Sequence, residues 1–347
     1  NDDQISQERA RVNFATEVKN YGTKAKTITV VSQLLDKGGK VVSEQRKLEN
    51  IAPGKLLKVS QQTAPITNPV LWSIENPYLY TVVTSIEEKG KLLDSIHTPY
   101  GIRWISWPVA RNNNDKRFFL NGKPVFINGI AEYEHLLGQS HAFSDEQVRS
   151  RVFQMKAAGF NAFRDAHQPH NLRYQEYWDR EGLLLWTQMA AHIWYDTPEF
   201  RKNFKELLID WVKERRNSPS VVLWGLENES TLPEDFAREC TELIRSLDPT
   251  ASSQRLVTTC NGGKGTDWDV PQNWTGTYGG DPKTYAEDMK RQVLIGEYGA
   301  WRTLDLHTEG SFNQNGPYSE DRMAQLMEMK VRLAESAKDG TSGHYFS

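Results

Sequence analysis

Apolar and polar residues alternate along the first third of the chain, as they do in half-buried strands. Ile28, Val30 and Leu34 alternate with polar partners, and the turn-forming sequence Asp-Lys-Gly-Gly at 36–39 follows this run. Further alternating runs and turns recur at similar spacing. Short strands of period two separated by turns are typical of a β-sandwich. We therefore predict an immunoglobulin-like β-sandwich over residues 1–112.

The pattern then changes to short apolar runs, each followed by a helical pattern. Runs of this kind predict buried parallel strands. Eight of them with crossover helices are typical of a TIM (β/α)8 barrel, which we predict for residues 113–347. The first residues, and the lack of a helical pattern after the last strand, predict truncation at both ends. The candidate strands are 125–130, 162–167, 183–189, 221–229, 256–260, 275–278, 293–298 and 344–346.

Several of the expected helices carry terminal signals. Ser144 and Gln147 match a capping box, and Gly159 ends the same helical run. Thr197 followed by Pro198 predicts the N-cap and first position of another helix. The apolar faces expected for three helices are Val148, Val152 and Met155; Phe200, Phe204, Leu207, Leu208 and Trp211; and Phe236, Cys240, Leu243, Ile244 and Leu247.

Two glutamates lie at the expected C-terminal ends of barrel strands, which is where the active sites of such barrels are found. Glu229 ends the run that begins at Ser220, and Glu297 ends the run that begins at Val293. Two facing carboxyl groups are what glycoside hydrolysis requires, one as acid/base and one as nucleophile. Taken singly, Asn228-Glu229 also fits a helix cap, and Glu297 also fits a structural pair with an arginine.

Three further residues are candidates to support the carboxyl pair. Asn228 is expected to hydrogen-bond a sugar hydroxyl next to the reacting carbon. A nucleophile must stay ionised, so a nearby cation or hydrogen-bond donor should lower its pKa. Arg164, at the end of the second strand, is the candidate cation, and Tyr278, after the sixth, is the candidate donor. For Arg164 the alternative is a salt bridge to Asp165 or another acid.

Histidines and tryptophans near the strand ends are candidates to line a substrate site. His135, His167 and His192 each follow an expected barrel strand, with simple loop packing as the alternative. Flat indole rings offer large apolar faces on which a sugar ring can stack. Trp186 and Trp224 are instead expected to point into the barrel layers. The stacking candidates are Trp194, Trp274 and Trp301.

Composition excludes several classes of function. The 347 residues carry a net charge of -3, so a nucleic-acid partner is not expected. No apolar run approaches the length of a membrane span. Cys240 and Cys260 are the two cysteines, which gives neither a disulfide framework nor a zinc spacing, and we expect both to be buried free thiols.

Five motifs in order along the chain resemble glycoside hydrolase family 2, the group of β-galactosidases, β-glucuronidases and β-mannosidases. They include a Trp-x-x-x-x-Pro-x-Leu-Tyr pattern at the end of the sandwich, Asn-Glu after the fourth barrel strand and Gly-Glu-Tyr-Gly after the seventh. The resemblance covers nearly the whole chain. The motifs lie at 71–80, 118–125, 155–169, 219–229 and 295–299.

The resemblance implies a retaining exo-β-glycosidase in which Glu229 is the acid/base and Glu297 the nucleophile. Terminal β-D-galactosides are the expected substrates. A β-glucuronidase is the closest alternative, because the element that reads the substrate carboxylate in that branch lies beyond the eighth strand. A non-catalytic carbohydrate-binding barrel is a further alternative, which predicts the loss of a catalytic carboxylate or of Asn228, and neither is lost.

The chain departs from the family pattern around the expected sugar site. Residues 131–135 keep only the last two positions of a common galactosidase motif, and Thr187-Gln188 stand where an acidic pair, used for magnesium in some members, is common. A neutral amide is a poor ligand for magnesium, so we expect no cofactor. The changes suggest a galactan-type oligosaccharide as substrate. We expect a periplasmic or secreted bacterial enzyme, and the resemblance is compatible with an oligomer.

Overall fold

The computed structural model divides the chain into two compact units. One comprises residues 1–104 with 179–182 and 217–219, and the other comprises the remainder. The sequence-based boundary at residue 112 stays a prediction. None of the described helices is long and apolar enough to cross a membrane. The structure describes residues 5–135, 140–190, 192–193, 196–230, 232–299 and 319–347.

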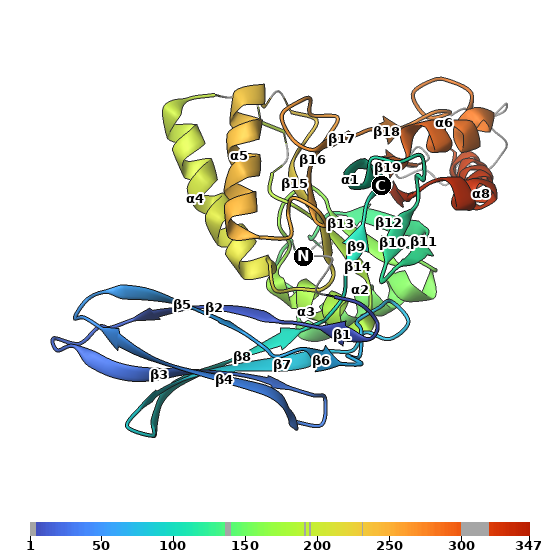
Figure 1. Ribbon diagram of the computed structural model, residues 1–347. Coiled ribbons are helices and arrows are strands. Elements are labelled where there is room, and N and C mark those ends of the chain that lie inside the picture. Colours follow the sequence, from blue (N-terminus) through green and yellow to red (C-terminus); the bar gives the residue numbers. More distant parts are fainter. Residues whose placement is uncertain (1–4, 136–139, 191, 194–195, 231, 300–318) are drawn as a thin grey trace. The chain divides into compact units, whose positions relative to one another are not determined.

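The first unit is the predicted antiparallel β-sandwich (Figure 1). A four-stranded sheet has the order β4-β3-β7-β8, a two-stranded sheet pairs β2 with β5, and a short ladder pairs β1 with β6. The strands are β1 (Arg9–Ala10), β2 (Asn13–Lys19), β3 (Lys26–Leu35), β4 (Val41–Ile51), β5 (Leu56–Gln62), β6 (Ile66–Thr67), β7 (Tyr80–Glu88) and β8 (Lys91–Tyr100).

The alternation read from the sequence sets the core of this sandwich. On β3, Ile28, Val30 and Leu34 are at most 2% exposed. Ile28 and Val30 pack with Val59 of β5, which joins the two sheets in one apolar cluster. The predicted turn at 36–39 connects β3 to β4, with a backbone bond from Gly39 N–H to Asp36 O of 2.9 Å. The burial of alternate residues and the tight turn together fix the antiparallel register between β3 and β4.

The second unit is a parallel barrel whose sheet has the order β17-β16-β15-β14-β13-β12-β20-β19-β18. A small antiparallel sheet of β9 (Ile105–Ser106), β10 (Phe118–Leu120) and β11 (Lys123–Val125) precedes it. The barrel strands are β12 (Ile127–Glu132), β13 (Ala162–Asp165), β14 (Leu184–Gln188), β15 (Val221–Asn228), β16 (Leu256–Cys260), β17 (Trp268–Val270), β18 (Gln272–Asn273), β19 (Leu294–Tyr298) and β20 (Gly343–Phe346).

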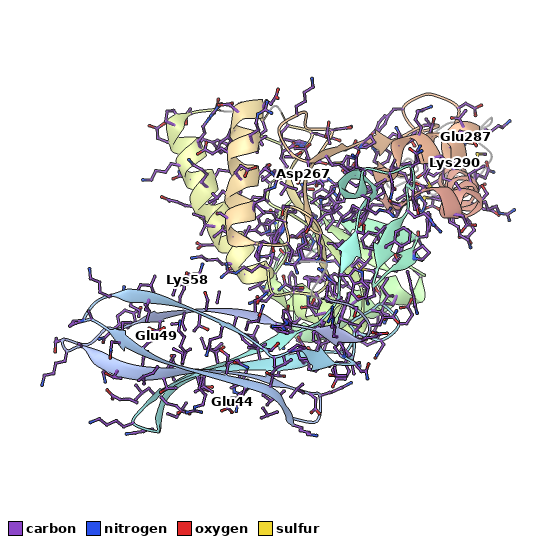
Figure 2. The ribbon with its side chains drawn as sticks, viewed as in Figure 1. Glu44, Glu49, Lys58, Asp267, Glu287 and Lys290 are labelled. Carbon is purple, nitrogen blue, oxygen red and sulfur yellow. The ribbon has the colours of Figure 1, made fainter. Side chains whose placement is uncertain are left out.

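The sixth barrel strand lies earlier in the chain than the sequence pattern indicated. β17 and β18 are two segments around Pro271, and they pair with β16 and β19 respectively. The predicted strand at 275–278 is a turn, with a bond from Thr277 N–H to Trp274 O of 3.0 Å. Asp267, labelled in Figure 2, secures the start of β17, since its Oδ2 accepts the Val257 N–H at 2.9 Å. Pairing with other strands leaves no periodic pattern of apolar residues in the sequence, so these two short strands were not predicted.

Helices cover the outside of the barrel, and their predicted terminal signals are present. Ser144 and Gln147 form the capping box of α2, and the Thr197 hydroxyl accepts the Phe200 N–H at the start of α4. On the outer surface of α6, Glu287 and Lys290 form an ion pair (Figure 2). The helices are α1 (Pro108–Arg111), α2 (Asp145–Ala157), α3 (Leu172–Glu181), α4 (Pro198–Arg215), α5 (Glu234–Leu247), α6 (Tyr285–Gln292) and α8 (Glu320–Ala337).

The layer between the strands and the helices holds the main apolar core of this unit, and two packing predictions fail there. α4 and α5 lie side by side (Figure 1). Trp224 is buried, but it packs outward against Trp211 of α4, at a ring separation of 4.9 Å, and not into the barrel. Leu207, expected on the buried face of α4, is 61% exposed. Cys240 and Cys260 are buried free thiols, as predicted.

Candidate active site

Arg164 connects the side chains at the C-terminal ends of four barrel strands. It is the penultimate residue of β13 and is fully buried. Its Nη1 donates to Glu297 Oε1 and to Gly296 O, both at 2.9 Å. Its Nη2 donates to Asn228 Oδ1 at 2.6 Å and to Gln188 Oε1 at 2.8 Å. Stacking on Trp186, at 4.6 Å from the ring, completes the surroundings of the guanidinium group.

Glu297 lies at the end of β19 and is 4% exposed. Burial raises its pKa above the ordinary value, the Arg164 charge opposes this shift, and the Glu229 charge adds to it. Arg164 lowers this pKa, as expected of a nearby cation, but the loss of hydration outweighs the attraction of the guanidinium group, so the pKa is raised overall. Arg164 is the predicted cation, and its partner is Glu297 and not a surface acid.

Glu229 differs from Glu297 in position and exposure. It follows the last residue of β15, and 43% of its side chain is exposed. Its φ angle of 50° lies in the left-handed region, which is uncommon for a residue with a side chain. Its N–H donates to Cys260 O at 2.9 Å. The carboxyl group thus stands at the rim, and its Oε2 is 3.4 Å from His192 Nε2.

Gln188 is a site residue that the sequence reasoning did not select. Its Oε1 accepts two hydrogen bonds from Arg164, and its Nε2 donates to Ala190 O at 2.7 Å. The sequence feature that could have identified Gln188 is its place at the end of a strand, at a position where the family often has an acidic residue. In this chain the amide oxygen orients Arg164, together with Asn228. The predicted bond from Asn228 to a sugar is untested, while its oxygen already accepts from Arg164.

The three predicted histidines occupy different settings. His167 Nε2 lies 3.6 Å from Glu297 Oε1. Burial, with the Arg164 charge, lowers the pKa of His167 to about 3, so the ring is neutral at physiological pH. His192 stands beside Glu229, and its ring centre is 6.5 Å from that of His167. His135 is exposed and its ring lies 5.5 Å from Tyr133, which also contacts His167.

Two of the aromatic candidates, Trp274 and Tyr278, lie within the described residues. Trp274 is within hydrogen-bonding reach of Glu297, which helps to lower the pKa of that carboxyl. Its Nε1 also donates to Gln272 Oε1 at 3.3 Å. Tyr278 packs edge-on against Trp274 and is 69% exposed. The remaining stacking candidates, Trp194 and Trp301, lie outside the described residues.

The acidic pair that some family members use for magnesium is replaced by Thr187 and Gln188 at the end of β14. Among the described residues, no group of three or more His, Cys, Asp or Glu has the arrangement to hold a metal ion. The Thr187 hydroxyl group accepts the Trp211 N–H at 3.0 Å and donates to Asp165 Oδ2 at 2.8 Å. This hydroxyl is therefore engaged within the protein.

Two glutamates of unequal exposure, an arginine that fixes the deeper one and an asparagine beside the outer one make up a constellation suited to acid-assisted displacement at a sugar. The family model of glycosyl hydrolases family 2 matches residues 2–103, and that of the TIM barrel domain of the same family matches residues 112–278. The chain belongs to glycosyl hydrolases family 2.

The relatives that this chain matches include β-glucuronidases and β-galactosidases. A β-glucuronidase of Bacteroides fragilis is 28% identical over 81% of this chain and 43% of its own length. A β-galactosidase of Bacteroides ovatus is 30% identical over 65% of this chain and 26% of its own. The β-glucuronidase structure of Bacteroides uniformis has a TM-score of 0.85 at 23% identity, over 99% of this chain and 44% of that one. This last likeness concerns the fold.

The chain spans less than half the length of each of these family 2 relatives. The family model of the barrel ends at residue 278, so it includes Arg164, Asn228 and Glu229 but not Glu297. In the structure, Glu297 is close enough to Glu229 for the Glu229 charge to raise its pKa.

Proposed function

We propose that this chain carries the catalytic centre of a retaining exo-β-glycosidase, with Glu297 as nucleophile and Glu229 as acid/base. The observation that carries the proposal is the contrast within the pair. Glu297 is buried and held by Arg164 at 2.9 Å, whereas Glu229 stands at the rim with 43% of its side chain exposed. A nucleophile needs a fixed, ionised carboxylate, and an acid/base must reach the leaving group and then water.

The first step forms a covalent glycosyl ester. Glu297 attacks the anomeric carbon, while Glu229 donates its proton to the glycosidic oxygen and the aglycone leaves as an alcohol. In the second step Glu229, now ionised, takes a proton from water as the water oxygen attacks the same carbon and releases Glu297. Two inversions give net retention of the β configuration.

A raised pKa is also typical of a general acid, which would exchange the roles of Glu297 and Glu229. Part of that shift comes from the Glu229 charge. A proton on Glu229 removes this part, and the Arg164 fork then favours the ionised form of Glu297. The first step requires this charge distribution, with the proton on Glu229 and the negative charge on Glu297 beside Arg164.

Terminal β-D-galactosides are the first substrate class that we propose, including those of galactan-type oligosaccharides. The support is the named β-galactosidases among the relatives, together with the departures at Thr187 and Gln188 from the magnesium-using pattern. β-D-Glucuronides are the second class. They are supported by the β-glucuronidase of Bacteroides fragilis, which matches 81% of this chain.

Initial rates of the full natural chain on p-nitrophenyl β-D-galactoside, β-D-glucuronide and β-D-mannoside test the substrate class. Glu297→Ala is the matched control and should lose turnover by several orders of magnitude, since the covalent route is removed. A galactoside rate that is lost in the control supports the first class. A rate confined to the glucuronide selects the second.

Azide distinguishes the roles of the two glutamates. With an activated aryl substrate, azide should rescue Glu297→Ala as the α-glycosyl azide, because the small anion enters from the face of the missing nucleophile. It should rescue Glu229→Ala as the β-glycosyl azide, after the covalent intermediate has formed. The reverse stereochemistry in the two variants refutes the assignment, and inactivity of the wild type on all glycosides refutes the proposed function.

A further inference from the structure

A second glutamate lies two residues before Glu229 and faces away from solvent. Glu227 is on β15 and is 1% exposed, and the proposed reaction gives it no role. Removing a carboxyl group from water costs free energy unless hydrogen bonds replace the lost hydration. The surroundings of Glu227 therefore indicate what its carboxyl group supports.

The Glu227 carboxyl group is lodged between the loops that follow β15 and β16. Its Oε2 accepts the Ser230 N–H at 2.8 Å. A Cβ atom at Gly262 would lie 1.5 Å from its Oε1, so only glycine leaves room for the carboxyl group there. From the other side, Asp269 Oδ1 accepts the Gly262 N–H at 3.0 Å. The pocket for Glu227 is thus built by a loop that is itself held in place.

Ser230, the partner of Glu227, joins the elements around the outer catalytic glutamate. Its Oγ accepts the Ile193 N–H at 2.7 Å and donates to Asn228 O at 3.1 Å. Ile193 directly follows His192, the residue whose ring stands 3.4 Å from Glu229. One serine therefore links the backbone on which Glu229 is carried to the segment that supplies its histidine neighbour.

The backbone of Glu229 needs such support. Its φ angle of 50° is a conformation that costs free energy for a residue with a Cβ atom, and it persists only when its surroundings enforce it. The N–H of Glu229 is held by Cys260 O, and the next N–H along the chain, that of Ser230, is held by Glu227. The two bonds restrain the turn from both sides.

We propose that Glu227 is a positioning residue for the acid/base: lodged against Gly262, it holds Ser230 and so aims Glu229 at the leaving-group oxygen. This inference rests on the proposed function. Burial raises the pKa of Glu227 from 4.5 to about 7, with Ser230 opposing the shift and the Asp269 charge adding to it. Either protonation state keeps an oxygen that accepts the Ser230 N–H, so glutamine is expected to replace Glu227 in this role.

The leaving-group dependence of the rate tests the proposal in the full natural chain. We would measure kcat and KM on phenyl and 2,4-dinitrophenyl β-glycosides of the sugar that the wild type accepts. Misplacing a catalytic group by about 1 Å costs roughly 100-fold in rate. Glu227→Ala is thus expected to lower kcat on the phenyl glycoside about 10- to 100-fold more than on the dinitrophenyl glycoside, which needs no proton. Glu227→Gln should keep the wild-type ratio.

Gly262→Ala provides an independent variant, because it displaces the Glu227 carboxyl without deleting it. It should reproduce the selective loss on the phenyl glycoside. In the double variant with Glu227→Ala, the new methyl group occupies the vacated space, so the loss should equal that of Glu227→Ala alone. If Glu227→Ala fails to fold, the single variant Gly262→Ala still tests the proposal.

Two results overturn the inference. One is a folded Glu227→Ala or Gly262→Ala variant with the wild-type ratio of the two rates, as a merely structural role predicts. The other is additive losses in the double variant. Inactivity of the wild type on every glycoside refutes the proposed function instead, so the two failures are distinguishable.

Discussion

Replacing Arg164 by methionine is the most direct test of how this buried cation acts on the deeper carboxyl group, Glu297. The guanidinium group is fully buried and donates to Glu297, Gly296, Gln188 and Asn228 at 2.6 to 3.2 Å. Methionine removes the charge and every donor, while burial and the Glu229 charge continue to raise the pKa of Glu297. The neutral form of Glu297 is then favoured further.

Removing one partner of a buried ion pair costs about 3 to 5 kcal/mol. At about 1.4 kcal/mol for each factor of ten, kcat/KM should fall by roughly two to four orders of magnitude at neutral pH. The sign of the pH effect follows from the same change. In the proposed mechanism, ionised Glu297 is the reactive form, so the acid limb of the profile should move to higher pH and part of the rate should return as the pH rises.

The assay is kcat/KM against pH on an activated aryl glycoside, with Arg164→Lys as the control. Lysine keeps the charge but cannot reproduce the planar fork, so the rate should fall while the acid limb stays near that of the wild type. Circular dichroism and thermal unfolding confirm that each variant is folded. An acid limb of folded Arg164→Met at the wild-type pH would refute the reasoning.

Three further predictions concern single groups. Glu229→Ala should lower kcat/KM on phenyl glycosides far more than on dinitrophenyl glycosides, and equal losses would contradict its role as acid. Because Glu227 has a pKa of about 7 against 4.5 in the unfolded chain, its ionisation destabilises the fold as pH rises through this interval. Glu227→Gln should therefore gain about 3 kcal/mol of stability over the wild type between pH 4 and pH 8, measured by denaturant unfolding at each pH, and a constant difference would exclude the linkage. Ser144→Ala should lower the free energy of unfolding by about 1 kcal/mol in the same assay, because the side-chain cap of α2 is lost. Ser144→Thr keeps the hydroxyl group and is the control. An unchanged free energy of unfolding in Ser144→Ala would show that the cap is dispensable.

Much of the fold follows from local sequence pattern. Burial of alternate residues on β3 and the capping box at Ser144 were both readable, because strand alternation and helix caps depend on neighbours a few positions apart. The sixth barrel strand was misplaced because β17 and β18 are short, polar in part and interrupted by Pro271. Their strand character comes from pairing with β16 and β19.

The order of short apolar runs was sufficient to place two glutamates and an arginine at the ends of neighbouring or opposing strands, since parallel strands bring their carboxyl ends to one edge. The hydration and the contacts of each group at that edge depend on the three-dimensional packing. Burial gives Glu297 a raised pKa despite Arg164, and the contact with Gly262 gives Glu227 its place behind Glu229. Hydration and packing depend on groups more than 30 positions apart in the chain, as in the bond between Arg164 and Asn228 (separation 64), and no local pattern records them.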